Sequence, residues 1–283
     1  MSELNSIFSA LELPAPTAAD RSNRPQRPWR LPDGAITALT VLALLTVWWA
    51  LSAWQVVPRL FLPAPAEVLA ALRSVALEGF VDATLWQHAS ASIARVLGAL
   101  LLAVATAVPL GVLIGSNRRV GAVFDPLIEF YRPVPPLAYL PLIVIWCGIG
   151  EVSKILLIYL AIFAPLAIAT VQGVRRVEPS RLRAAQALGA TRWQLMRFVI
   201  LPSAAPDVLT GIRIGVGVGW STLVAAELIA ATRGLGFMIQ SAAQFLVTDV
   251  VLMGIFVIAA IAFGFEWALR RLQRIWVPWA GKT

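Results

Sequence analysis

Apolar residues gather along this chain in six runs that are each long enough to cross a lipid bilayer. Crossing about 30 Å of hydrocarbon at about 1.5 Å per residue takes about 20 apolar residues in a helix. The pattern therefore predicts an all-α protein with six transmembrane helices, at residues 36–54, 93–115, 127–146, 155–174, 208–231 and 250–269.

The composition agrees with this pattern. Hydrophobic residues make up 59% of the 283 positions and charged residues 13%, whereas about 25% are charged in a soluble domain. The first run follows a segment rich in proline and arginine and has no small-residue cleavage site after it, so we expect it to stay in the membrane. We predict a largely disordered cytoplasmic leader at 1–34, a transmembrane domain at 35–274 and a cytoplasmic tail at 275–283.

The basic residues predict how the helices are oriented. Short loops rich in lysine and arginine stay in the cytoplasm. Most of the 23 basic residues fall in segments that six spans place on one side: 21–30, 118–119, 175–197 and 270–282. Both termini should therefore be cytoplasmic. This distribution also accounts for the net charge of +8 without a nucleic-acid partner.

Few residues offer catalytic or metal chemistry. His88 and Cys147 are the chain's one histidine and one cysteine. We expect Cys147 to be a small apolar packing residue, and His88 lacks the partners at ligand spacing that a metal site would need. The terminal Gly281-Lys282-Thr283 lacks the earlier glycine and the following helix of a phosphate loop. No cofactor or metal is therefore predicted for this chain.

Three glycines favour close helix packing. Gly211, Gly215 and Gly219 recur every four residues, which places them on one face of a helix where a second helix can approach.

One polar stretch, residues 178–202, separates the fourth and fifth runs, and it predicts two short helices. Ser180 can cap the first helix, and Gly189 can end it. Thr191 and Gln194 have the spacing of a capping box for the second helix. Pro202 then predicts a turn into the next span.

The order of residues in this stretch resembles a known docking element. Ala184 and Ala185, Gly189 four residues later, and Val199, Leu201 and Pro202 are similar to the EAA loop of bacterial ABC-importer permeases. The usual glutamate is Arg183 here. The resemblance implies that the loop binds an ATPase subunit through these residues: Arg183, Ala184, Ala185, Gln186, Leu188, Gly189, Ala190 and Pro202.

The resemblance extends over about residues 35–280. Residues 129–150 resemble the nitrate, sulfonate and taurine branch of this family, and residues 82–88 and 219–237 resemble its taurine permeases most. It implies the type I (MetI-like) fold with a cytoplasmic coupling helix, in a bacterial inner membrane. It also implies a second copy of the chain, two ATPase subunits that bind ATP and Mg²⁺, and a periplasmic substrate-binding protein. The implied activity is import of taurine, or of another small sulfonate or nitrate.

Polar residues inside or beside the spans are candidates for the transport pathway. They are Glu129, Arg132, Pro133, Trp220 and Glu227, and prolines after position 132 would break the helix and free carbonyl oxygens. Alternatively, the charged ones pair with each other or with lipid headgroups. Arg95 and Arg213 lie near span ends, where we expect them to anchor at headgroups.

Two other kinds of membrane protein fit less well. A secondary transporter would show inverted repeats and a carboxylate cluster at the membrane midplane. An intramembrane enzyme would need a nucleophile with a base, or a metal pair. We find none of these patterns.

Overall fold

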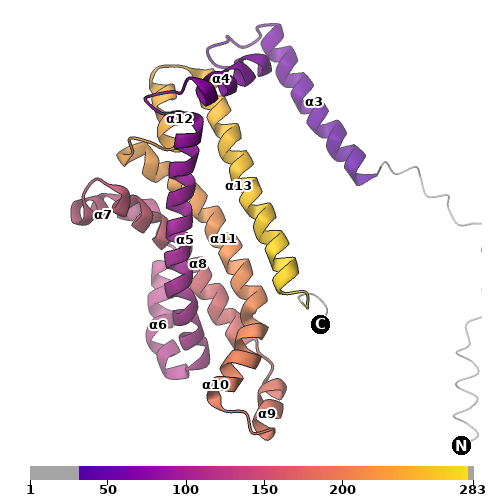
Figure 1. Cartoon of the computed structure of the whole chain (residues 1–283), viewed down its shortest axis with the longest axis vertical. Coiled ribbons are helices and arrows are strands. Elements are labelled where there is room, and N and C mark those ends of the chain that lie inside the picture. The colour runs from indigo at the N-terminus through magenta and orange to yellow at the C-terminus, as the bar shows by residue number, and fades with distance from the viewer. Residues whose placement is uncertain (1–31, 280–283) are drawn as a thin grey trace, which may run out of the picture. The chain divides into compact units, whose positions relative to one another are not determined.

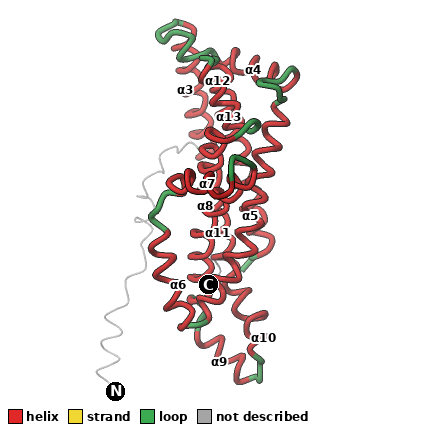
Figure 2. Tube along the Cα trace, turned by 90° about the vertical axis from the view of Figure 1, so that its left-hand side faces the viewer, coloured by secondary structure: helices red, strands yellow, loops and turns green. Residues whose placement is uncertain are grey.

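The computed structural model describes residues 32–279, and its regular elements are helices (Figure 1, Figure 2). In chain order they are α3 (Asp33–Ala53), α4 (Pro65–Leu77), α5 (Leu85–Ser116), α6 (Arg118–Tyr131), η1 (Pro136–Tyr139), α7 (Leu140–Cys147), α8 (Glu151–Arg175), α9 (Pro179–Ala187), α10 (Arg192–Gln194), η2 (Leu195–Ile200), α11 (Leu201–Ala230), α12 (Leu235–Gln244) and α13 (Thr248–Trp276). The all-α prediction is confirmed. The predicted leader falls almost wholly on residues 1–31, which lie outside the described part.

The chain divides into two units, residues 1–50 and 51–283. The first unit contributes α3, an apolar helix whose span of Gly34–Ala53 agrees with the predicted first transmembrane helix. The second unit contains the other helices.

The second unit is built around α8, which lies between α5 and α11 (Figure 1). Leu157, Ile158, Ile162 and Leu166 of α8 are completely buried. Figure 1 also shows α9 and α10 at one end of this bundle and α4 and α12 at the other. We call these the α9 end and the α12 end.

Glycines let the neighbouring helices approach α8 closely. A β-carbon on Gly111 of α5 would lie 2.7 Å from the β-carbon of Thr170, and one on Gly211 of α11 would lie 2.6 Å from that of Ala169. A β-carbon on Gly215 would meet Ile162 at 2.9 Å. The predicted packing role of the glycines in α11 is confirmed.

Substituting one of these glycines should therefore loosen the bundle. We expect Gly211→Ala to lower the free energy of unfolding by about 1–3 kcal/mol, because the added methyl group overpacks a tight interface. Gly217→Ala is the matched control, since a β-carbon there has no neighbour within 4 Å. The thermal midpoints of the purified variants measure the difference. Equal midpoints would contradict the packing role.

The predicted third span is not one continuous helix, and the break predicted after position 132 is confirmed. Five helices of the described residues are long and apolar enough to cross a membrane, and residues 127–146 are not among them. The chain leaves α6 after Tyr131 and resumes as η1 and the short α7. Pro133, Pro135 and Pro136 cause the interruption, because proline has no N–H and its ring clashes with a preceding helical turn.

The residue that closes this interrupted segment also differs from its prediction. Cys147 ends α7 and is exposed on the described chain. It is therefore not the packing residue that we expected.

Candidate functional site

The first candidate site is the coupling loop, residues 178–202, at the α9 end. Its first helix, α9, closes on Gly189, which has φ +80°. The amide of Gly189 donates to the Gln186 carbonyl at 2.9 Å, and the amide of Ala190 donates to the Ala185 carbonyl at 3.1 Å. These two bonds form a Schellman motif, which needs a left-handed residue that glycine adopts without strain.

The second helix of the loop begins as predicted. The Thr191 hydroxyl accepts from the amide of Gln194 at 3.3 Å, and the Gln194 side chain accepts from the amide of Thr191 at 2.7 Å. The predicted cap of the first helix is wrong. Glu178 takes the capping position without a side-chain bond, and Pro179 starts the helix.

The loop presents its predicted docking residues to the outside. Leu188 is 89% exposed, and Arg183, Ala184, Gln186 and Gly189 are exposed as well. Ala185 and Ala190 are half-buried. The loop also exposes Trp193 and Phe198, and several large apolar side chains exposed in one short segment are typical of a surface that a partner covers.

The predicted turn at Pro202 is wrong. Residues from Arg192 onward form one unbroken helical segment through α10, η2 and α11. η2 is a π-helical turn in which the amide of Leu201 donates to the Met196 carbonyl, five residues back. This wider turn accommodates Pro202, which has no N–H to give, so the helix continues from the loop into α11.

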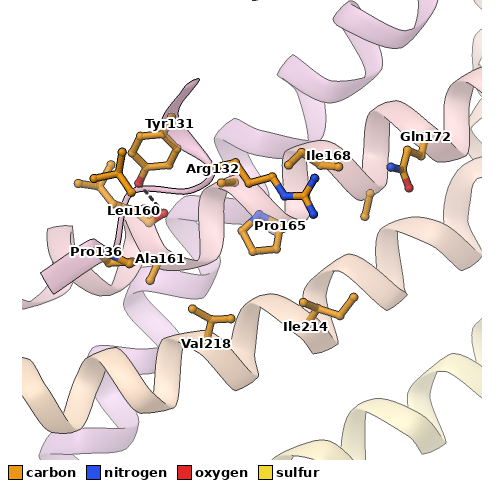
Figure 3. Close-up of a pocket in the computed structure, with 13 residues that line it drawn as sticks. Tyr131, Arg132, Pro136, Leu160, Ala161, Pro165, Ile168, Gln172, Ile214 and Val218 are labelled. Atoms are coloured by element: carbon orange, nitrogen blue, oxygen red, sulfur yellow. Dashed lines mark hydrogen bonds between the residues drawn. The ribbon is translucent and has the colours of Figure 1, made fainter. Parts of the chain in front are cut away.

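The second candidate site is a pocket of about 430 Å³ between the interrupted segment and helices α8 and α11. We call it the pathway pocket (Figure 3). The guanidinium of Arg132 extends along it toward Ile168 and Gln172. The Tyr131 hydroxyl donates to the Leu160 carbonyl at 2.8 Å and so fixes the start of the interruption against α8.

A smaller pocket of about 190 Å³ continues from the pathway pocket and shares Arg132, Ile168 and Gln172 with it. It is lined by Glu129 and by Asp125 and Arg175, which pair at 2.6 Å. Since Arg175 ends α8, this second pocket lies toward the α9 end. Glu129 and Arg132, both predicted to line the pathway, thus line these two connected pockets. Pro133, a third predicted residue, lies in the interruption that follows α6.

Glu227 lies elsewhere, in a buried charge cluster at the α12 end. It is completely buried and pairs with Arg95 at 2.5 Å. Arg95 also donates to both carboxylate oxygens of Glu151, at 2.6 and 2.8 Å, and Lys154 pairs with Glu151 at 2.9 Å. The two positive and two negative charges balance, which lets Arg95, Lys154 and Glu227 lie buried among apolar helices, while Glu151 at the edge of the cluster is 58% exposed.

The expectation that Arg95 anchors at lipid headgroups is wrong. Its side chain is 5% exposed, because α5 is longer than the predicted span and continues back to Leu85. Arg95 therefore lies well inside the bundle, where it joins α5, α8 and α11.

The charge cluster also holds the turn between α11 and α12. Ser92 accepts from the amide of Leu235 at 2.9 Å and donates to Glu227 at 2.8 Å, and Glu227 accepts from the amide of Gly236 at 2.8 Å. His88 donates through Nε2 to the Phe80 carbonyl and accepts through Nδ1 from the amide of Gly234. An N–H and a carbonyl at its two nitrogens require the neutral ring, so His88 is a buried structural residue.

Arg213 and Trp220 both face α13. Arg213 pairs with Glu266 at 2.5 Å and is partly buried, so its predicted headgroup anchor is wrong. Trp220 is 5% exposed and packs edge-on against Phe265. It lines a separate pocket with Glu266, away from Arg132. Its pathway role stays a prediction.

The charge cluster could have been predicted from two charged residues. Arg95 and Glu227 carry opposite charges inside two apolar runs, and such residues usually form an ion pair in the folded protein. Gln172 was missed because a lone glutamine near a span end carries no pattern.

The comparisons with known proteins agree on one family. Residues 107–276 match the family model described as binding-protein-dependent transport system inner membrane component. The chain is 59% identical over 259 residues to the taurine transport system permease protein TauC of Escherichia coli (strain K12), covering 90% of this chain and 94% of TauC. It is 34% identical to the putative aliphatic sulfonates transport permease protein SsuC of Bacillus subtilis (strain 168), covering 90% and 91%.

The fold agrees with a solved transporter. A chain of the inward-facing MetNI methionine ABC transporter matches with a TM-score of 0.59 at 18% identity, covering 66% of this chain and 93% of that one. The apolar helices, the interrupted third segment and these matches together make the chain a multi-pass membrane protein and a transporter subunit rather than an enzyme. It belongs to the family of binding-protein-dependent transport system inner membrane components, the permeases of ABC transporters that work with ATPase and substrate-binding subunits.

Proposed function

We propose that this chain is the permease subunit that imports taurine into the cytoplasm of a bacterium. The carrying observation is the 59% identity to TauC across 90% of this chain and 94% of TauC. Because the match at this level of identity spans nearly the whole length of both chains, we infer the same substrate class.

In this proposal two copies of the chain enclose the pathway. Two ATPase subunits bind ATP and Mg²⁺ and dock on the coupling loops, and a binding protein delivers taurine to the α12 end. The exposed Leu188 and Arg183 support the docking. The unbroken helix from Arg192 into α11 supports mechanical coupling, because a push on the loop would tilt α11 as a rigid rod.

The proposed orientation places the α9 end and both termini in the cytoplasm of an inner-membrane protein. Arg118 and Arg119 start α6 at that end, Arg175 and Arg176 follow α8, and the coupling loop adds further arginines. This concentration of basic residues supports the assignment.

Uptake in proteoliposomes tests the proposal. The chain is reconstituted with its ATPase and binding protein, and labelled taurine is added outside with ATP inside. We expect ATP-dependent uptake that unlabelled taurine abolishes, and none without the binding protein. Absence of taurine uptake by an assembly that hydrolyses ATP would refute the substrate.

The second candidate function is import of an aliphatic sulfonate or another small anion by the same mechanism. The 34% identity to SsuC of Bacillus subtilis supports it. In the same assay, stronger competition by an alkyl sulfonate than by taurine would favour this candidate.

A further inference from the structure

We propose that the pathway pocket is a transit site for a small zwitterion, with Arg132 and Gln172 holding its anionic head group and backbone carbonyl oxygens receiving its ammonium. This inference rests on the proposed function, since it names how the same chain handles the solute after the binding protein releases it.

The first argument is the free charge of Arg132. Among residues 32–279, no carboxylate forms an ion pair with it, although Glu129 lies one turn earlier on α6. Arg95, Arg175 and Arg213 are all paired in that part of the chain. Arg132 is exposed on the described chain, where water or a ligand can reach it, and an unpaired cation at membrane depth is costly unless one of them compensates it.

The second argument is the position of Arg132. It lines both the pathway pocket and the smaller pocket beyond it, together with Ile168 and Gln172. A solute that moves from one pocket to the other must pass the guanidinium. Arg132 is therefore placed to contact every solute that passes through both pockets.

The third argument is the chemistry opposite Arg132. The Gln172 amide has no side-chain hydrogen bond within the described residues, and Figure 3 shows it on α8 beyond the tip of Arg132. A planar guanidinium binds a sulfonate or carboxylate through two parallel N–H donors, and an amide can add a third. Together they form an anion site that is not committed to a protein carboxylate.

The fourth argument concerns the ammonium. Pro165 in the middle of α8 has no N–H, so the carbonyl oxygen of Ala161 lacks its helical donor, and both residues line the pathway pocket. A free carbonyl oxygen accepts from an ammonium group. The pocket thus offers complementary groups to both ends of an amino sulfonate, in a volume at the small end of ligand sites.

Direct binding tests this site without the binding protein. The permease–ATPase complex in nanodiscs is titrated with labelled taurine. We expect saturable binding by the wild type and at least 10-fold weaker binding by Arg132→Gln. Arg132→Lys should lie between them, because it keeps the charge and loses the paired donors. Gln172→Ala should weaken binding less than Arg132→Gln.

The matched control is Arg119→Gln, which removes the same charge from an exposed position in α6, outside both pockets. We expect wild-type binding from it. Co-purification of the ATPase reports that each variant is folded. Absence of saturable binding by the wild type, or equal binding by Arg132→Gln and the wild type, would overturn the site.

Competition by analogues tests the ligand class. Ethanesulfonate should displace taurine, and ethylamine should do so at least 10-fold less well, because Arg132 provides the stronger contact. Displacement by ethylamine as strong as that by ethanesulfonate would overturn the anion site.

The uptake assay separates this inference from the proposed function. If the wild type imports another sulfonate in place of taurine, the proposed substrate fails. The site still stands in that case if Arg132→Gln reduces that uptake. If the wild type imports taurine and Arg132→Gln imports it equally well, the site fails and the proposed function stands.

Discussion

Replacement of Arg95 by methionine should destabilise the permease more than loss of any other ion pair described here. The substitution leaves Glu227 completely buried with a negative charge that no cation balances. Breaking a buried pair by removing one partner costs about 3–5 kcal/mol. The loss of folded protein on heating, followed by gel filtration in detergent, measures the effect.

Two comparisons identify the cause of this loss. Arg213→Met removes a partly exposed pair with Glu266, so we expect a cost of about 1 kcal/mol or less. The double variant Arg95→Met/Glu227→Met removes both buried charges and leaves Glu151 with Lys154. We expect it to be more stable than Arg95→Met alone. A double variant that is less stable would contradict this charge effect, because the hydrogen bonds that Glu227 accepts from Ser92 and the Gly236 amide would then outweigh its unbalanced charge.

The sequence correctly predicted several features that depend only on residues close together in the chain. The capping box at Thr191 and Gln194, the helix end at Gly189 and the glycine face at Gly211 and Gly215 all depend on residues within one or two helical turns of each other. Each of these predictions is confirmed. The family resemblance added the coupling loop, whose exposed Leu188 agrees with a docking role.

The wrong predictions concern features that are determined by residues far apart in the sequence or by details of the backbone. Arg95 pairs with a residue 132 positions later, and no local pattern shows that distance. The effect of proline was predicted correctly at one place and wrongly at another. Pro133, Pro135 and Pro136 interrupt the third apolar run, as the sequence indicated. Pro202 does not end the helix, because the π-helical turn before it accommodates a residue that has no N–H to donate.

A single substitution on the surface of the coupling loop should prevent the ATPase from docking. We expect Gly189→Asp to remove the response of ATP hydrolysis to loaded binding protein, at least 10-fold, and to reduce co-purification of the ATPase. An added β-carbon has open space around it, so the cost to the fold is limited to the left-handed backbone, about 1–2 kcal/mol. The new carboxylate, however, stands among Arg181, Arg183 and Arg192 on the surface proposed to enter the ATPase.

Gly148→Asp separates docking from backbone strain. Gly148 has φ +75° against +80° at Gly189, and neither has a neighbour near an added β-carbon. Gly148 lies between α7 and α8, away from the coupling loop. Gly148 also has ψ 176°, a backbone region that is essentially restricted to glycine, so Gly148→Asp carries the same new charge and at least as much backbone strain. The ATPase should stay bound only to Gly148→Asp. Full stimulation of hydrolysis in Gly189→Asp would show that the ATPase does not dock at this turn.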